Sequence, residues 1–266
     1  MSRPDTWRHQ LSTAALALCL TFLACPLALV VWIGLSDAPT ISLRAGGLTL
    51  RSIEAFLADP AWADAARRSL VMAVIVAALA VAAGSLAAYV NVRQTGRLSI
   101  LTAGLMILPA VVPTVLYALG LVLLAARIPL SAIELVVIGQ SVLATPLAFL
   151  VMRIGLHALR PEQVEAARLL GARWHTTLLR VVVPPLVPYA AVSAAMAASL
   201  SLAEPVLAIF LVNDAAATLP QKSFQGLRFS FDPRIMTAAA FIVLLTAVVT
   251  IPALLLAHRR RMAVDR

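Results

Sequence analysis

The stretch Glu165–Gly171, with the sequence EAARLLG, is followed ten residues later by Val181–Pro184, with the sequence VVVP. This charged region interrupts a chain that is otherwise mostly apolar. A polar stretch between two membrane-spanning helices cannot bury itself in lipid, so it must face water or another protein. Its length and its glycine predict two short helices in a loop outside the membrane.

The composition places the chain among membrane proteins. Of its 266 residues, 62% are hydrophobic and 12% are charged. Soluble domains average about 45–50% apolar and about 25% charged residues. Because a spanning helix needs about 20 apolar residues, this length accommodates roughly six spans and leaves no room for a separate soluble domain. We therefore predict a single all-α, polytopic membrane domain.

Six apolar runs, each bounded by charged residues, are the predicted transmembrane helices. Helices are expected because irregular backbone would leave amide groups unpaired in lipid. The first run is longer than the roughly 7–15 apolar residues of a signal peptide, so we predict an uncleaved span. Pro109 and Pro113 predict kinks in the third run. The predicted spans are residues 11–35, 69–92, 100–126, 131–152, 183–212 and 235–257, with a polar loop over residues 153–182.

The distribution of basic residues predicts the orientation. With the N-terminus inside, the inner segments hold 13 basic and 4 acidic residues, and the outer segments hold 8 and 6. Because cytoplasmic loops carry the excess of arginine and lysine, we expect both termini and the loop 153–182 in the cytoplasm. The basic residues punctuate the apolar runs and form no patch with interleaved aromatics, so nucleic acid is not an expected partner.

The longest predicted outer segment, residues 36–68, contains Ile53, Phe56 and Leu57 at helical spacing. This spacing predicts a short amphipathic helix, which either rests at the membrane surface or packs on the bundle. The two cysteines, Cys19 and Cys25, lie in the first span on different helix faces, so a disulfide is not expected. Since no residues have metal-ligand spacing, we expect neither a metal nor a cofactor.

The polar loop carries its own helix signals. Pro161 suits the first position of a helix, where its missing N–H would be unpaired anyway. Glu165 then lies near the positive end of the helix dipole. Gly171 can adopt the left-handed conformation that ends a helix. A second short helix is expected from Trp174, and Pro184 is expected to set the angle at which the chain enters the fifth span.

The combination of Glu165, Ala166, Ala167, Gly171 and Pro184 resembles the EAA loop in the permease subunits of bacterial type I ABC importers. That resemblance implies a bacterial inner-membrane protein in which this loop grips an ABC ATPase dimer. It also implies a second, homologous permease subunit and a periplasmic or extracellular solute-binding protein. ATP hydrolysis would occur on the separate ATPase, so the chain itself would hold no catalytic residues.

The resemblance covers roughly residues 50–255, with Val183 in place of the family's usual leucine. The order of Ser199–Glu204, Thr218–Pro220 and Asp232–Pro233 is similar to the spermidine/putrescine branch. It implies that the chain forms half of a path for a small polar solute, a polyamine or a related amino compound. An opine, an aminophosphonate or ferric ion stays open as the solute.

Two polar residues inside the predicted spans are candidates for the substrate path, because such residues are costly in lipid. Glu204 lies in the fifth span beside Pro205, where a carboxylate would attract an amine. The alternatives are a structural acid, a protonated acid or a partner for an arginine of the other permease. Gln140 in the fourth span either lines the path or bonds a neighbouring helix. Glu134 follows Ser131 by three residues and is expected to complete a capping box.

Two other classes of protein compete with this interpretation. An ion-coupled secondary transporter has a similar composition, but such proteins usually show several intramembrane acids or inverted repeats. A membrane enzyme would need clustered polar groups at one depth. The four histidines, His9, His157, His175 and His258, are instead scattered over the predicted cytoplasmic segments. The sequence therefore favours the importer subunit.

Overall fold

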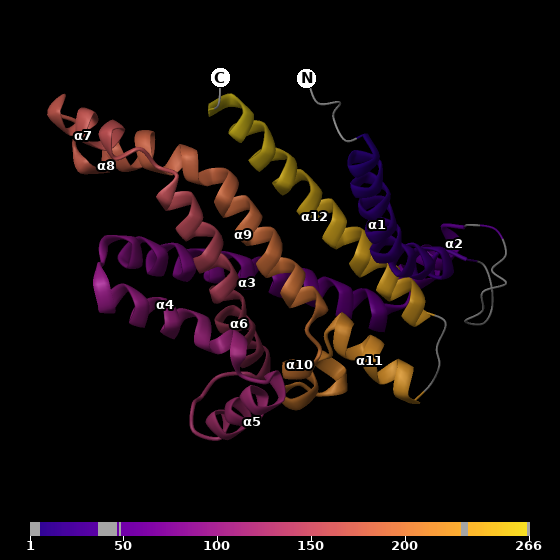
Figure 1. Cartoon of the computed structure of the whole chain (residues 1–266). Coiled ribbons are helices and arrows are strands. Elements are labelled where there is room, and N and C mark those ends of the chain that lie inside the picture. The colour runs from indigo at the N-terminus through magenta and orange to yellow at the C-terminus, as the bar shows by residue number, and fades with distance from the viewer. Residues whose placement is uncertain (1–5, 37–46, 48, 230–233, 265–266) are drawn as a thin grey trace. The chain divides into compact units, whose positions relative to one another are not determined.

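The computed structural model describes residues 6–36, 47, 49–229 and 234–264 (Figure 1). No β-strand is present in these ranges, which confirms the predicted all-α fold. Asp232–Pro233 and both chain ends lie outside them. The α-helices are α1 (Thr6–Gly34), α2 (Arg51–Ala58), α3 (Pro60–Arg93), α4 (Gly96–Val111), α5 (Thr114–Ala125), α6 (Ala132–His157), α7 (Pro161–Leu169), α8 (Trp174–Thr177), α9 (Val183–Ala203), α10 (Val206–Leu211), α11 (Leu219–Phe229) and α12 (Arg234–Val264).

The chain divides into two compact units, residues 1–60 with 225–244 and residues 61–224 with 245–266. In the first unit, α1 packs closely on the start of α12. A Cβ on Gly34 would lie 2.3 Å from the carbonyl oxygen of Met236, and Thr237 donates a hydrogen bond to the carbonyl of Gly34. The amphipathic helix predicted in residues 36–68 is α2, whose Phe56 is fully buried against the ring of Phe241.

The core of the second unit is built from α3, α5, α6, α9 and α10. Small residues allow its helices to approach closely. A Cβ on Gly84 of α3 would lie 2.7 Å from Ala148 of α6, and one on Gly155 of α6 would lie 2.7 Å from the ring of Tyr189 on α9. Small residues at such contacts are typical of helix pairs in membranes, where close van der Waals packing drives association.

Five of the described helices are long and apolar enough to cross a membrane. They account for all predicted spans except the third, with ends that differ by several residues. The prediction placed the start of the second span at residue 69, whereas α3 begins at Pro60 and so includes the last part of the segment 36–68. The five helices are Gln10–Gly34, Pro60–Arg93, Ala132–His157, Trp174–Ala203 and Arg234–Arg259.

The third apolar run is two helices and not one kinked helix. α4 and α5 meet at an angle of 93°, with the break at Val112 and Pro113. Pro113 disfavours a helical conformation at the residue before it, and Val112 is extended with ψ of 128°. Pro109, by contrast, lies inside α4. Whether the pair crosses the membrane as one broken span stays a prediction.

Helix α11 was not predicted, although the sequence carries a signal for it. Thr218 and Gln221 form a reciprocal pair, in which the backbone N–H of each donates to the side chain of the other. This arrangement is a capping box, and Pro220 suits the first turn of the helix that follows. Within the second unit, the start of α11 is held on α3 because Leu219 N–H donates to Ser69 Oγ at 2.8 Å.

Candidate functional site

The loop between α6 and α9 begins with helix α7. Pro161 occupies its first turn with Glu162 beside it, as the sequence predicts. The helix ends in a Schellman motif, because Ala172 N–H donates to the Ala167 carbonyl at 3.1 Å and Gly171 N–H donates to the Arg168 carbonyl at 2.9 Å. Gly171 has a φ of +78°, which confirms the predicted left-handed termination. The chain therefore turns sharply and in a defined way after α7.

The second helix of the loop is continuous with the fifth predicted span. α8 passes into a π turn over Leu178–Val182, and the turn leads directly into α9. The prediction of a separate second helix was wrong in this respect. Pro184 and Pro185 supply the physical reason, since a proline lacks an N–H and its ring clashes with the carbonyl four residues earlier. A π turn widens the helix just before these prolines.

An open groove of about 540 Å³ separates α7 from the π turn and the start of α9. Ala166 and Ala167 line one wall, and Pro184 lines the other, so the structure brings three of the five predicted loop residues together. Glu165 and Gly171 do not line it. The complete lining is Gln163, Ala166, Ala167, Leu170, Arg180, Val181, Pro184 and Pro185.

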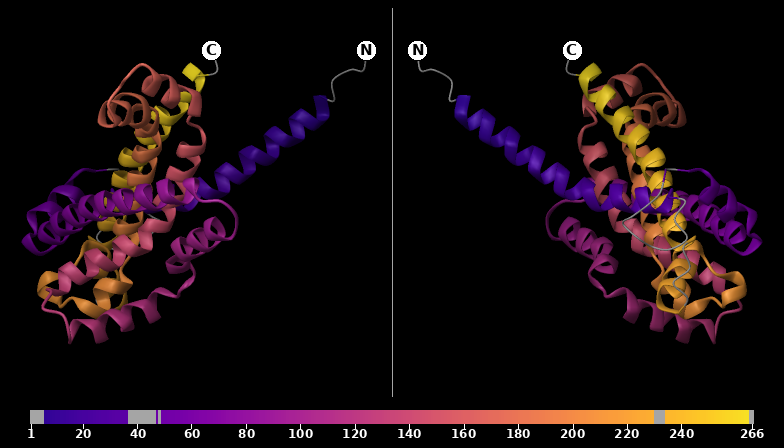
Figure 2. Two further views of the ribbon diagram at one scale, coloured as in Figure 1. Left: turned by 90° about the vertical axis from the view of Figure 1, so that its left-hand side faces the viewer. Right: turned by 90° about the vertical axis from the view of Figure 1, so that its right-hand side faces the viewer.

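The loop exposes three large apolar side chains, one of which, Leu170, lines this groove. Leu169 and Leu170 at the end of α7 are 89% and 88% exposed, and Trp174 at the start of α8 is 72% exposed. No residue of α7 is buried. Apolar side chains that gather on a polar, structured loop are typical of a protein interaction site. In Figures 1 and 2, α7 and α8 lie at one end of the second unit and α10 lies near the other.

The second candidate site is the break between α9 and α10. α9 ends at Ala203 and α10 begins at Val206, so the fifth predicted span is interrupted at Glu204 and Pro205. The half-buried Glu204 caps the new helix. Its carboxylate accepts hydrogen bonds from the backbone N–H of Val206 at 2.8 Å and of Leu207 at 3.1 Å. The acid therefore satisfies two amides that the proline break leaves without helical partners.

Gln140 of α6 lies against the same break and is only 1% exposed. Its Oε1 accepts a hydrogen bond of 2.6 Å from Ser201 Oγ, and its Nε2 donates a longer bond of 3.5 Å to the Glu204 carbonyl. The two residues predicted for the substrate path thus lie together, although they are 64 positions apart in the chain. Both contribute hydrogen bonds within the protein at this position.

The predicted capping box at the start of α6 is also present. Glu134 N–H donates to Ser131 Oγ, and Ser131 N–H donates to the Glu134 carboxylate at 2.7 Å. No group of three or more His, Cys, Asp or Glu residues suited to a metal occurs among the described residues.

Comparison with known proteins identifies the class to which this architecture belongs. Residues 80–263 match the family of binding-protein-dependent transport system inner membrane components. This match covers more than half of the chain, so the chain belongs to that family of multi-pass inner-membrane permeases. Members of this family are components of transport systems and not catalytic proteins.

Three similar proteins are described as permeases of transport systems. The chain is 30% identical over 247 residues to a protein of Sinorhizobium fredii described as a probable ABC transporter permease; the match covers 88% of this chain but only 43% of that relative's length. It is 29% identical to the putrescine transport system permease protein PotI of Escherichia coli, over 86% of this chain and 84% of PotI. It is 24% identical to the spermidine/putrescine permease PotC of the same organism, over 80% and 81%.

Solved structures share the fold. A bacterial alginate ABC transporter, in complex with a periplasmic protein that carries an alginate pentasaccharide, aligns with a TM-score of 0.68 and 15% identity. The alignment covers 94% of this chain and 93% of that one. An amino acid ABC transporter aligns with a TM-score of 0.56 and 16% identity, over 80% and 100%. These structures support the importer permease fold, which agrees with the family match.

Proposed function

We propose that this chain forms half of the translocation path of an ATP-driven importer for a polyamine or a related small amino compound. Its partners are a homologous second permease, an ABC ATPase dimer and a solute-binding protein outside the membrane. Family membership supports the transport role, and the relatives that carry putrescine or spermidine in their names support the solute class.

The observation that carries the coupling proposal is the groove between α7 and the π turn. It is open, and it is lined by the small side chains of Ala166 and Ala167 and by the exposed Leu170; the same loop also exposes Trp174. A partner side chain that enters such a groove would bury apolar surface on both of its walls. The Schellman motif and the continuous α8–α9 helix make the loop stiff. A displacement of an ATPase bound to this loop would therefore be transmitted directly to α9.

We further propose that Glu204, rather than Gln140, contacts the solute. Gln140 is almost completely buried, and its amide group bonds to Ser201 and to the carbonyl of Glu204. Glu204 is half-buried, and its carboxylate retains further acceptor capacity beyond the bonds from Val206 and Leu207. Gln140 would then act as a positioning residue that holds the break in place.

The test is uptake by the complete transporter reconstituted with its cognate partners in proteoliposomes. Ligand-induced thermal shifts of the cognate binding protein, with polyamines, opines, aminophosphonates, amino acids and ferric ion, first select the solute. We expect a polyamine to shift it, and we expect uptake to require ATP and the binding protein and to survive a protonophore. Uptake that needs a proton gradient and proceeds without ATP would contradict the importer and favour a secondary transporter.

A further inference from the structure

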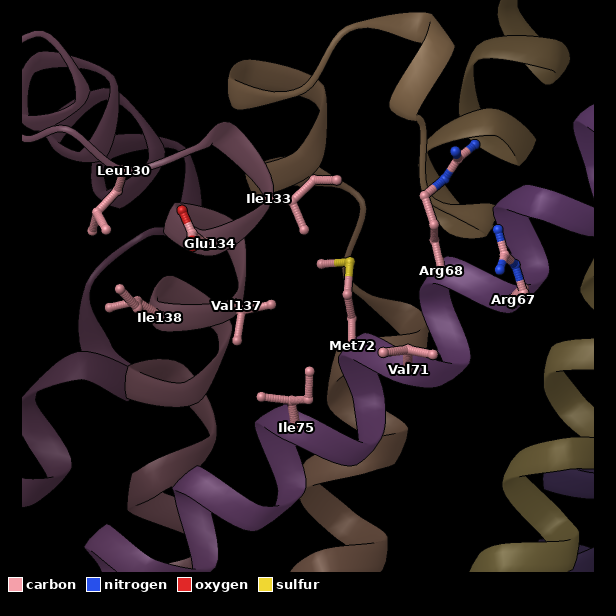
Figure 3. A pocket seen from close by; sticks show the side chains of 10 residues that line it. All are labelled: Arg67, Arg68, Val71, Met72, Ile75, Leu130, Ile133, Glu134, Val137 and Ile138. Carbon is pink, nitrogen blue, oxygen red and sulfur yellow. The ribbon is translucent and has the colours of Figure 1, made fainter.

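A second groove, of about 550 Å³, lies between α3 and α6 of the second unit, and it shares no lining residue with the groove in the loop (Figure 3). Its floor belongs to the core, since Met72 and Val137 are 4% and 9% exposed. Its walls are large apolar side chains that are themselves exposed, namely Val71, Ile75 and Ile138. This groove on two predicted spans would face lipid or another membrane helix.

Charged side chains stand at one end of the groove. Figure 3 shows Arg67 and Arg68 on α3 at this end, with Glu134 across from them on α6. Arg67 and Arg68 immediately precede the second predicted span and Glu134 lies in the first turn of α6, so this end corresponds to the boundary between lipid and water. The α3 residues from Arg67 to Ile75 rise about 12 Å, at about 1.5 Å per residue. That length is close to the hydrocarbon thickness of one leaflet, roughly half of about 30 Å.

Both arginines have nitrogen atoms that can bind an anion. Arg67 pairs with Asp64 at 3.3 Å, but both side chains are largely exposed, and surface pairs of this kind contribute little. Arg68 donates through Nε to the Ala217 carbonyl at 3.3 Å. Within the described part of the chain, its two terminal nitrogens make no hydrogen bond. A phosphate at this end would therefore meet charge-assisted donors.

Glu134 adds an opposite charge on the other side of the groove. Its Oε2 accepts hydrogen bonds of 2.7 Å from Ser131 N–H and from Ser131 Oγ. Its Oε1 accepts no hydrogen bond from the described residues. A headgroup that carries a phosphate and an ammonium group would match the arginines and this carboxylate together, whereas a headgroup without an ammonium group would match the arginines alone.

We propose that this groove binds a phospholipid with an ethanolamine headgroup. The phosphate lies on Arg67 and Arg68, the ammonium group lies at Glu134, and one acyl chain fills the groove over Met72 and Val137. A helix of the second permease fits these observations less well. Helix contacts in membranes favour small residues, as at Gly84, but this groove is lined by valine, isoleucine, leucine and methionine. Covering the arginines with an apolar helix would also cost their desolvation.

The test counts phospholipids retained by the assembled transporter. The complex is reconstituted in nanodiscs with equal amounts of phosphatidylethanolamine and phosphatidylglycerol, extracted gently and examined by native mass spectrometry. We expect up to about a fivefold loss of retained phosphatidylethanolamine for each of Arg67→Gln and Arg68→Gln, since an exposed pair of opposite charges contributes up to about that factor. Arg97→Gln is the matched control, because Arg97 is exposed at the other end of α3, where the chain turns into α4, and should change nothing.

Two further variants separate the headgroup from the acyl chain. Ile75→Trp fills the groove and leaves both arginines in place, so it should also remove the retained lipid. Glu134→Gln keeps the capping box, because glutamine serves as well as glutamate there, and it should abolish only the preference for ethanolamine. Equal retention in all variants would overturn the proposal. Cross-linking of an Ile138→Cys variant to the second permease would overturn it as well, by identifying a helix as the occupant.

Discussion

The loop before α9 and the break after it are both polar interruptions of apolar helices, yet their side chains are arranged in opposite ways. In the loop, no residue of α7 is buried, and Leu169, Leu170 and Trp174 face outward. At the break, Gln140 is almost fully buried and both it and Glu204 accept hydrogen bonds within the chain. The contrast separates an exposed apolar surface, which we propose as the docking surface, from a polar cluster that holds the helix break.

The largest effect is expected from filling the groove in the loop. Ala166 is exposed and lines the groove, so Ala166→Trp should leave the permease folded while blocking the partner. We expect the cognate ATPase to bind at least about thirtyfold more weakly, the loss typical of an interface hot spot. Retention of the ATPase in pull-downs measures this. Ala126→Trp, an exposed alanine just after α5, is the control; equal loss in both variants would contradict a specific groove.

A matched pair of glutamines tests the two regions against each other. Gln140→Leu leaves the Ser201 hydroxyl without its partner in a buried place and should cost about 1–3 kcal/mol of unfolding free energy. Gln163→Leu, on the exposed surface of α7, should change that free energy by no more than about 0.5 kcal/mol. Thermal unfolding of the purified protein measures both. Similar stabilities for the two variants would remove the distinction between the regions.

Glu204→Gln removes the charge at the break and keeps the cap, because a glutamine oxygen in the place of Oε1 can accept from both amides, as Oε1 does at 2.8 Å from Val206 and 3.3 Å from Leu207. If the carboxylate binds an amine, the KM for uptake should rise about tenfold, the equivalent of a hydrogen bond to a charged group. Assembly and melting temperature should stay unchanged. A lower melting temperature with an unchanged KM would assign Glu204 a purely structural role.

The smallest effect is expected from the corresponding change in the loop. Glu165 is exposed, and the described residues offer its side chain no hydrogen bond or ion pair. Glu165→Gln should therefore leave unfolding unchanged and weaken ATPase binding by no more than about fivefold, as for an exposed ion pair with a partner. Titration of the ATPase against both forms of the complex checks this. A larger loss would place Glu165 at the centre of the interface.

The local features of both regions were predictable from the sequence. Pro161 and Gly171 set the two ends of α7 through their own backbone restrictions, and the Ser131–Glu134 pair caps α6 over only three positions. Such signals depend on neighbours in the chain. The capping box at Thr218 and Gln221 is equally local, so the same kind of signal predicts the start of α11.

The remaining features depend on contacts between distant parts of the chain. The sequence suggested Gln140 and Glu204 separately, but their meeting at one helix break follows from how α6 packs on α9 and α10. The 93° angle between α4 and α5 likewise exceeds what Pro113 alone predicts. In a spanning helix, apolar side chains occur on every face, because both lipid and protein accept them. The sequence pattern therefore does not reveal which face packs on a neighbouring helix.

The most direct test of the docking surface is retention of the cognate ATPase by a Gly171→Asp variant, compared with Gly96→Asp. Both glycines have positive φ, of +78° and +64°, and a Cβ on either meets nothing within 4 Å. The two substitutions therefore introduce the same charge and a similar backbone strain of about 1–2 kcal/mol. We predict that only Gly171→Asp loses the ATPase while both variants remain folded in the membrane. Full retention by Gly171→Asp, or equal loss in both, would contradict the assignment of the α7–α8 loop as the docking surface.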